Sequence, residues 1–212
     1  MEQSSQITII INESGKNQQI LFNEFQNTPN KIIINGILQN TINQRYNLEE
    51  TNNNITMIWD SKLNDCTNMF SSCKKIKMID LSKFDYSKVE NMDYMFNNCN
   101  SLESVIFNKI STPLVKSMTY MFYGCKSLIS LDLSSFDTSS VTTMTNMFYD
   151  CNNLISLNLG NFDTSQVTDM TYMFQNCKSL IYLNIIKFNV PSSTRRTYMF
   201  EGINTNLIYC FK

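Results

Sequence analysis

Cysteine is the residue type in this chain whose spacing could support chemistry. Five cysteines recur every 26 residues, each three residues after a phenylalanine: Cys73, Cys99, Cys125, Cys151 and Cys177. Thiols in such a series can form disulfides, bind a metal ion or pack as small groups in a core. Metal-binding cysteines usually come in close pairs, about two to four residues apart, and this sequence has no such pair. We therefore expect buried free thiols, with some disulfide bonding as the main alternative.

A column of aspartates is the second candidate for chemistry. Asp85, Asp137 and Asp163 share the repeat spacing and could suggest stacked calcium ligands. Ser111 interrupts the column, however, and the bidentate acid of a calcium loop is missing. Turn capping by Asp-Thr-Ser explains these residues better. Because histidine and the common nucleophile and phosphate-binding motifs are also absent from the sequence, we expect no enzyme activity, no metal site and no cofactor.

The charge balance narrows the range of partners. The chain has 17 Lys and Arg residues against 18 Asp and Glu residues, which gives a formal net charge of −1. Without a basic field, nucleic acid is not expected as a partner. The sequence has no run of about 20 apolar residues, so we expect no direct membrane insertion.

These residues belong to a repeat that organises most of the chain. Met-Phe recurs at a spacing of 26 residues, at 69–70, 95–96, 121–122, 147–148, 173–174 and 199–200. A period of this length is typical of solenoids, in which neighbouring repeats share one core. Apolar residues three apart, such as Val141, Met144 and Met147, predict one stripe of a short helix around each Met-Phe. Alternation at Leu157 and Leu159 predicts a short strand after it.

The repeat resembles two known patterns. Leu154-x-x-Leu157-x-Leu159 resembles the strand signature of leucine-rich repeats. A longer string is similar to the 26-residue repeat of BspA-like surface proteins: Val141-Thr142-x-Met144-x-x-Met147-Phe148-x-x-Cys151-x-x-Leu154. The resemblance implies an interaction or surface role without catalytic residues. We predict an α/β solenoid, a leucine-rich-repeat-like stack of 26-residue strand-turn-helix units with a β-rich N-terminal cap. Parallel strands are expected near 79–81, 105–107, 131–133, 157–159 and 183–185.

The ends of the chain depart from the repeat. Residues 7–11 predict a strand, and residues 31–34, Asn35-Gly36 and 37–42 predict a hairpin with a tight turn. We expect a β-rich capping region at 1–54, about five to six repeats at 55–200 and a C-terminal cap at 201–212. The first residues show no signal peptide, which favours the cytosol, whereas the family resemblance favours a cell-surface or secreted location.

The exposed side of the predicted strands is the candidate functional surface. Two rows of residues flank the buried leucines: Ser104, Ser130, Ser156 and Tyr182 in one, and Asp80, Asp132, Asn158 and Asn184 in the other. Their hydroxyl and amide groups suit polar, water-mediated contacts. We predict non-catalytic recognition or adhesion of a protein or glycan partner through this strand face. The alternative is an intracellular scaffold or a structural subunit of a larger assembly.

Overall fold

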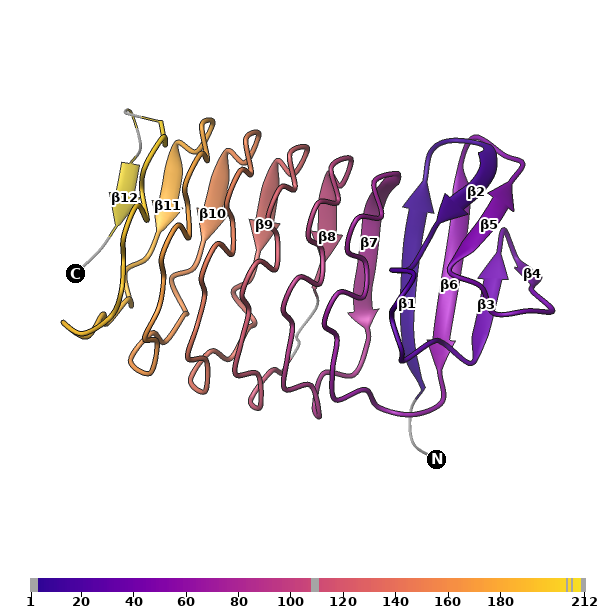
Figure 1. The fold of residues 1–212 in the computed structure, drawn as a ribbon, viewed down its shortest axis with the longest axis horizontal. Coiled ribbons are helices and arrows are strands. Elements are labelled where there is room, and N and C mark those ends of the chain that lie inside the picture. Colours follow the sequence, from indigo (N-terminus) through magenta and orange to yellow (C-terminus); the bar gives the residue numbers. More distant parts are fainter. Residues whose placement is uncertain (1–3, 108–110, 205, 207, 211–212) are drawn as a thin grey trace.

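The computed structural model describes residues 4–107, 111–204, 206 and 208–210, and its coils stack side by side along one axis (Figure 1). The first sheet contains β1 (Ser5–Ile11), β3 (Lys31–Ile34), β4 (Ile37–Leu38), β6 (Asn53–Trp59), β7 (Ile76–Lys83) and β8 (Ser104–Ile106). Its strand order is β4-β3-β6-β1-β7-β8. The second sheet contains β9 (Ser130–Asp132), β10 (Ser156–Asn158), β11 (Tyr182–Asn184) and β12 (Ile208–Cys210). β2 (Gly15–Gln19) pairs with β5 (Arg45–Leu48).

The repeat period sets the register of the parallel strands. Leu157 of β10 pairs with Leu131 of β9 and Leu183 of β11, so that partners are 26 residues apart. Ile79 of β7 pairs with Val105 of β8 at the same offset. These central residues are buried, and together they form one wall of the core. The prediction of parallel strands that recur with the repeat is therefore confirmed within each sheet, although β8 and β9 lie in different sheets.

No helix occurs among the residues that the structure describes, so the predicted α/β solenoid of strand-turn-helix units is wrong. An α-helix needs each amide to donate to the carbonyl four residues earlier. Here the amide of Phe148 donates to Met173 O of the next repeat at 2.9 Å, and the amide of Met147 donates to Met144 O at 3.2 Å. The same alternation recurs in neighbouring repeats. The apolar spacing of three residues is thus the period of successive tight turns. Within the described part of the chain, no helix has the length and hydropathy to cross a membrane.

Left-handed backbone in every Met-Phe segment explains the absence of a helix. Asn146 has φ 56° and Asp150 has φ 60°, values that interrupt a right-handed helix. The equivalent pairs in the other repeats are Asn68 and Ser72, Tyr94 and Asn98, Tyr120 and Gly124, Tyr172 and Asn176, and Tyr198 and Gly202. Each pair makes the chain turn, so that its amides face the adjacent repeat instead of its own preceding turn.

A ladder of phenylalanines runs along the stack; it is buried in the core from Phe70 to Phe174 and exposed at its last member, Phe200. Ring centroids of successive repeats lie 5.0–5.9 Å apart with nearly parallel planes, in the order Phe70, Phe96, Phe122, Phe148, Phe174 and Phe200. Offset stacking at such distances is favourable. The repeats are therefore held together by side-chain stacking inside and by backbone hydrogen bonds around the coil.

The N-terminal strands close one end of the stack. β1 lies between β6 and β7 and is antiparallel to both, with Ile9 opposite Ile55 and Ile79. Its alternate residues are buried against the repeats. The predicted hairpin is confirmed: β3 and β4 pair antiparallel across Asn35 (φ 50°) and Gly36 (φ 83°), although the second strand ends at Leu38.

Candidate functional site

The predicted strand face forms an aligned surface. In β9, Ser130 and Asp132 are exposed on either side of the buried Leu131. The register aligns Ser130, Ser156 and Tyr182 in one row and Asp132, Asn158 and Asn184 in the other. The remaining predicted residues, Ser104 and Asp80, lie in the neighbouring sheet, on β8 and β7. The structure therefore brings most of the predicted residues into two continuous rows.

Local hydrogen bonds occupy much of the Asp and Asn row. Asp132 Oδ1 accepts from the amide of Ser134 at 2.9 Å, and Asn158 Oδ1 accepts from the amide of Gly160 at 3.1 Å. Asn184 Nδ2 also donates to Asn158 Oδ1 at 2.9 Å. Such side-chain turns fix the path of the chain as it leaves each strand. Part of this row thus has a structural role.

A stripe of isoleucines runs beside the strand face. Ile129, Ile155 and Ile181 precede β9, β10 and β11, and they are 50%, 44% and 46% exposed. The amides of Ile155 and Ile181 each donate to the isoleucine carbonyl one repeat earlier, at 2.9 Å, which keeps the stripe aligned. The strand face therefore combines polar rows with an exposed apolar edge.

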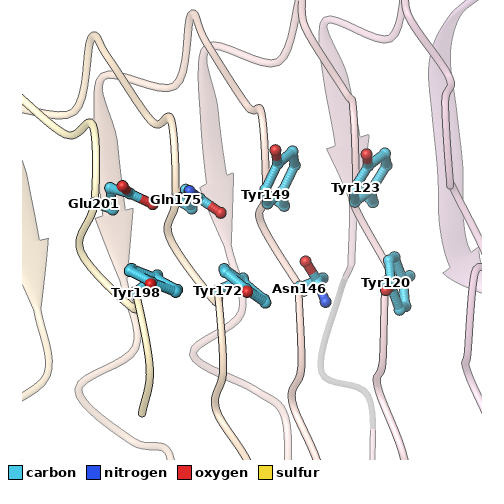
Figure 2. Close-up of a pocket in the computed structure, with 8 residues that line it drawn as sticks. All are labelled: Tyr120, Tyr123, Asn146, Tyr149, Tyr172, Gln175, Tyr198 and Glu201. Atoms are coloured by element: carbon cyan, nitrogen blue, oxygen red, sulfur yellow. Dashed lines mark hydrogen bonds between the residues drawn. The ribbon is translucent and has the colours of Figure 1, made fainter.

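A second surface, which we did not predict, is built from tyrosines on the Met-Phe segments. We call it the tyrosine face; its members are Tyr94, Tyr120, Tyr123, Tyr149, Tyr172 and Tyr198. Figure 2 shows four of the residues directly before Met-Phe in one column, namely Tyr120, Asn146, Tyr172 and Tyr198. Residues directly after Met-Phe form a second column beside it, namely Tyr123, Tyr149, Gln175 and Glu201. The strands of the same coils lie behind both columns (Figure 2).

The tyrosine rings stack along these columns. Ring centroids are 4.8 Å apart for Tyr94 and Tyr120, and 5.4 Å apart for Tyr172 and Tyr198, with nearly parallel planes. In the second column Tyr123 and Tyr149 stack at 4.8 Å. Burial, followed by the neighbouring tyrosines, raises the pKa of Tyr123. This phenol therefore stays protonated at neutral pH and can donate a hydrogen bond.

The first column is interrupted at one repeat. Asn146 stands where the neighbouring repeats have Tyr120 and Tyr172, and it lines an open groove of about 450 Å³ between the two columns. Asn146 as a whole is 6% exposed, and its side-chain amide, which makes no hydrogen bond to any residue that the structure describes, is accessible to solvent from the groove. This amide can therefore form hydrogen bonds with a group that enters the groove.

The tyrosines of the first column occupy unfavourable backbone positions. Their φ angles are 57° at Tyr94, 58° at Tyr120, 60° at Tyr172 and 54° at Tyr198. Left-handed backbone suits Gly, Asn and Asp, whereas a bulky residue there is strained. Asn68 and Asn146 fill the same position in other repeats with φ 61° and 56°. The backbone alone would thus favour asparagine throughout, so the tyrosine rings must contribute something else.

The cysteine column is part of the core. Six cysteines in the described part of the chain are free and buried: Cys66, Cys73, Cys99, Cys125, Cys151 and Cys177. Cys151 Sγ donates to Phe122 O of the preceding repeat at 3.1 Å, and three other cysteines make the equivalent bond. Burial raises the pKa of Cys99 and Cys177 to about 12. These thiols are therefore neutral and unreactive near pH 7.

The aspartate column serves to fix turns. Asp163 Oδ1 accepts from the amide of Ser165 at 2.9 Å, and Asp85 Oδ1 accepts from the amide of Ser87 at 2.9 Å. Partial burial alone would raise the pKa of Asp85, but hydrogen bonds from Ser87 and Lys62 hold it at about 2. Among the described residues, no group of three or more Cys, Asp or Glu side chains is arranged to hold a metal ion.

One protein-family model matches the chain twice, at residues 38–129 and 105–207. The two matches together cover most of the sequence, including every residue of the tyrosine face and the whole isoleucine stripe. No curated protein and no solved structure matches the chain. The chain therefore belongs to the family described as "Mycoplasma protein of unknown function, DUF285".

Proposed function

We propose that this chain is a non-catalytic recognition or adhesion module that binds a protein or glycan partner against the tyrosine face. The observation that carries the proposal is the presence of tyrosine at left-handed positions where asparagine serves as well, as at Tyr120 and Tyr172. Strain of this kind is often found at functional sites, where it is retained for a purpose. Tyrosine offers a large, rigid contact area and a hydroxyl group, which is why binding surfaces are rich in it.

The repeat architecture supports contact over an extended surface. Residues of the tyrosine face come from successive coils, so they lie in two columns along the stack (Figure 2). Repeat proteins commonly use such elongated surfaces to bind partners. The groove between the columns is lined by five tyrosines, with Asn146, Gln175 and Glu201 as the other lining residues. Aromatic and amide groups of this kind suit a partner with mixed polar and apolar surface.

The strand face is a second candidate surface for the same class of function. Its isoleucine stripe is about half exposed, and it lies next to the polar row that contains Ser130 and Ser156. An apolar strip bordered by polar groups is typical of protein interfaces. We propose this face as the alternative contact surface, most suitable for a protein partner.

We also propose that the module acts at a cell surface or in secreted form. The support for this is the resemblance of the Val141–Leu154 string to the repeat of BspA-like surface proteins. The alternative is an intracellular scaffold or structural subunit, which would make its contacts through the ends of the stack. These ends include the two-residue edge strand β4, where Ile37 and Leu38 are 69% and 58% exposed.

A binding array with paired variants tests the proposal. The labelled protein is applied to a printed array of glycans and extracellular proteins, and wild type is compared with Tyr120→Asn/Tyr172→Asn. Asparagine already occupies this position in two repeats, so we expect the fold to persist and binding to fall by about tenfold or more. The matched strand-face variant is Asp132→Lys/Asn158→Lys, on adjacent strands. Loss of binding only in the strand-face variant would transfer the function to that face. Binding to no array component, by wild type or either variant, would favour the scaffold.

A further inference from the structure

We infer that the groove above Asn146, between the rings of Tyr120 and Tyr172, binds one neutral sugar ring of a glycan. This inference rests on the proposed function of the tyrosine face and names the ligand class. Three features carry it: a gap in an aromatic column, an amide at the gap that makes no hydrogen bond to a described residue, and the chemistry of the groups around it.

The gap has the dimensions of one ring. Neighbouring tyrosines in the column stack at 4.8 and 5.4 Å on either side of it. Tyr120 and Tyr172 belong to coils two repeats apart, so their separation along the stack is about 10 Å, twice the roughly 4.8 Å spacing of adjacent strands. A flat group inserted over Asn146 would therefore contact an aromatic face on each side, at the spacing that the column already uses.

Asn146 supplies the polar part of the site. It lines the groove, and its amide has no hydrogen-bond partner among the described residues and is accessible to solvent. The amide combines donor hydrogens with an acceptor oxygen. A sugar hydroxyl likewise donates and accepts, so one ligand hydroxyl or an adjacent pair would satisfy this group.

A pyranose matches the surrounding groups better than a peptide does. Its two faces carry C–H groups, which are attracted to the electron-rich faces of Tyr120 and Tyr172, and its edge carries hydroxyls. The phenols of Tyr123 and Tyr149 lie in the second column, within the same groove (Figure 2). A proline-rich peptide also fits aromatic grooves, but its prolines lack N–H groups and would leave the acceptor of Asn146 unpaired.

Charge favours a neutral ligand. Glu201 lines the end of the groove, and Gln175 Nε2 donates a hydrogen bond to its carboxylate. No Lys or Arg is among the residues that line the groove. A carboxylated or sulfated sugar would therefore meet a like charge without a compensating cation.

The test fills the gap with the residue that other repeats use. Asn146→Tyr places a fifth tyrosine in a column whose positions at 94, 120, 172 and 198 already accept tyrosine with nearly the same φ angle. The matched control is Asn68→Tyr, the same substitution at the same repeat position outside the groove. Calorimetry is performed with hexasaccharides of glucose, galactose, mannose and N-acetylglucosamine, with a heparin hexasaccharide, and with a decaproline peptide. Thermal unfolding of each variant confirms that the fold is intact.

We expect at least one neutral hexasaccharide to bind wild type and Asn68→Tyr, with binding by Asn146→Tyr weakened by about tenfold or more. Neutral saccharides that bind Asn146→Tyr as well as wild type, or that bind none of the proteins, would overturn the inference. Binding of decaproline or heparin alone would overturn it in favour of a peptide or an acidic glycan. The broader proposal is judged separately: array binding that survives Asn146→Tyr but is lost in Tyr120→Asn/Tyr172→Asn would refute the sugar site and retain the tyrosine face.

Discussion

Tyr172→Asn should leave the stability of the protein almost unchanged, although it removes a large aromatic side chain. The substitution relieves left-handed strain at φ 60°, which is about 1–2 kcal/mol for a residue with a bulky side chain. It also removes the stacking of Tyr172 on Tyr198 at 5.4 Å, a contribution of about 0.5–1.5 kcal/mol beyond area burial. The backbone bond from the amide of residue 172 to Thr197 O, 3.0 Å, does not depend on the side chain. Because the relief of strain offsets most of the lost stacking and of the contact area lost with the partly buried ring, we expect a net change within about 1 kcal/mol.

Urea unfolding followed by circular dichroism measures this change, with the slope of the transition as a check that the unfolded surface is the same. The expected result is a midpoint close to that of wild type at unchanged slope. A loss of more than about 2 kcal/mol would show that the ring is a structural support, and the argument from strain to binding would fail. The same purified variant, folded but weak in array binding, would separate the functional role of Tyr172 from a structural one.

Three further predictions concern the core. Phe148→Ala removes a fully buried ring stacked on Phe122 and Phe174 at 5.6 and 5.7 Å, so unfolding free energy should fall by about 3–5 kcal/mol. Ser156→Ala on the strand face should change it by less than about 0.5 kcal/mol, and similar urea midpoints for the two variants would contradict the assignment of core and surface. Stability should fall as the pH rises from about 8.5 towards 12, because the unfolded chain releases thiol protons while Cys99 and Cys177 keep theirs. A flat profile over this range would argue against their burial. When the native protein is treated with a maleimide at pH 7.5, Cys99 and Cys177 should remain unlabelled until denaturant is added, as measured by peptide mass spectrometry. Rapid labelling of these two cysteines in the native protein would contradict their burial.

The strand half of each repeat was predictable from the sequence because its signals are local. Alternation around Leu157 identifies a strand, and the constant period then dictates a parallel register with Leu131 and Leu183. The Asn35-Gly36 turn was predictable for the same reason, since its residues adopt positive φ readily. In these segments the short-range preference and the tertiary structure agree.

The other half of the repeat was not predictable by the same reasoning. An apolar spacing of three residues fits one face of a helix, and it also fits consecutive tight turns. Hydrogen bonds between repeats, such as Phe148 N to Met173 O, stabilise the tight turns instead of a helix. The two partners of each bond lie in different repeats, so no single repeat contains this signal. Asn146 and Asp150 were a usable clue, because asparagine and aspartate tolerate the left-handed conformation that ends a helix.

The sequence shows the regular spacing of the tyrosines, but it does not predict that they form an exposed surface. Tyr94, Tyr120, Tyr172 and Tyr198 share the repeat period, and a helix interpretation gives no reason to place them in an exposed column. Their functional interest comes from two properties of the folded chain, the φ angles and the groove at Asn146. Neither property can be read from residue types alone.

Hydroxyl-radical footprinting with the bound partner from the array is the most direct test of the tyrosine face. The method reports side-chain exposure, and Tyr198 on the tyrosine face and Tyr182 on the strand face are 54% and 39% exposed in the free protein. We predict that the partner protects Tyr120, Tyr172 and Tyr198 from oxidation while Tyr182 and Ile181 react as in the free protein. Protection of Tyr182 and Ile181, with the tyrosine face still reactive, would contradict the proposed site.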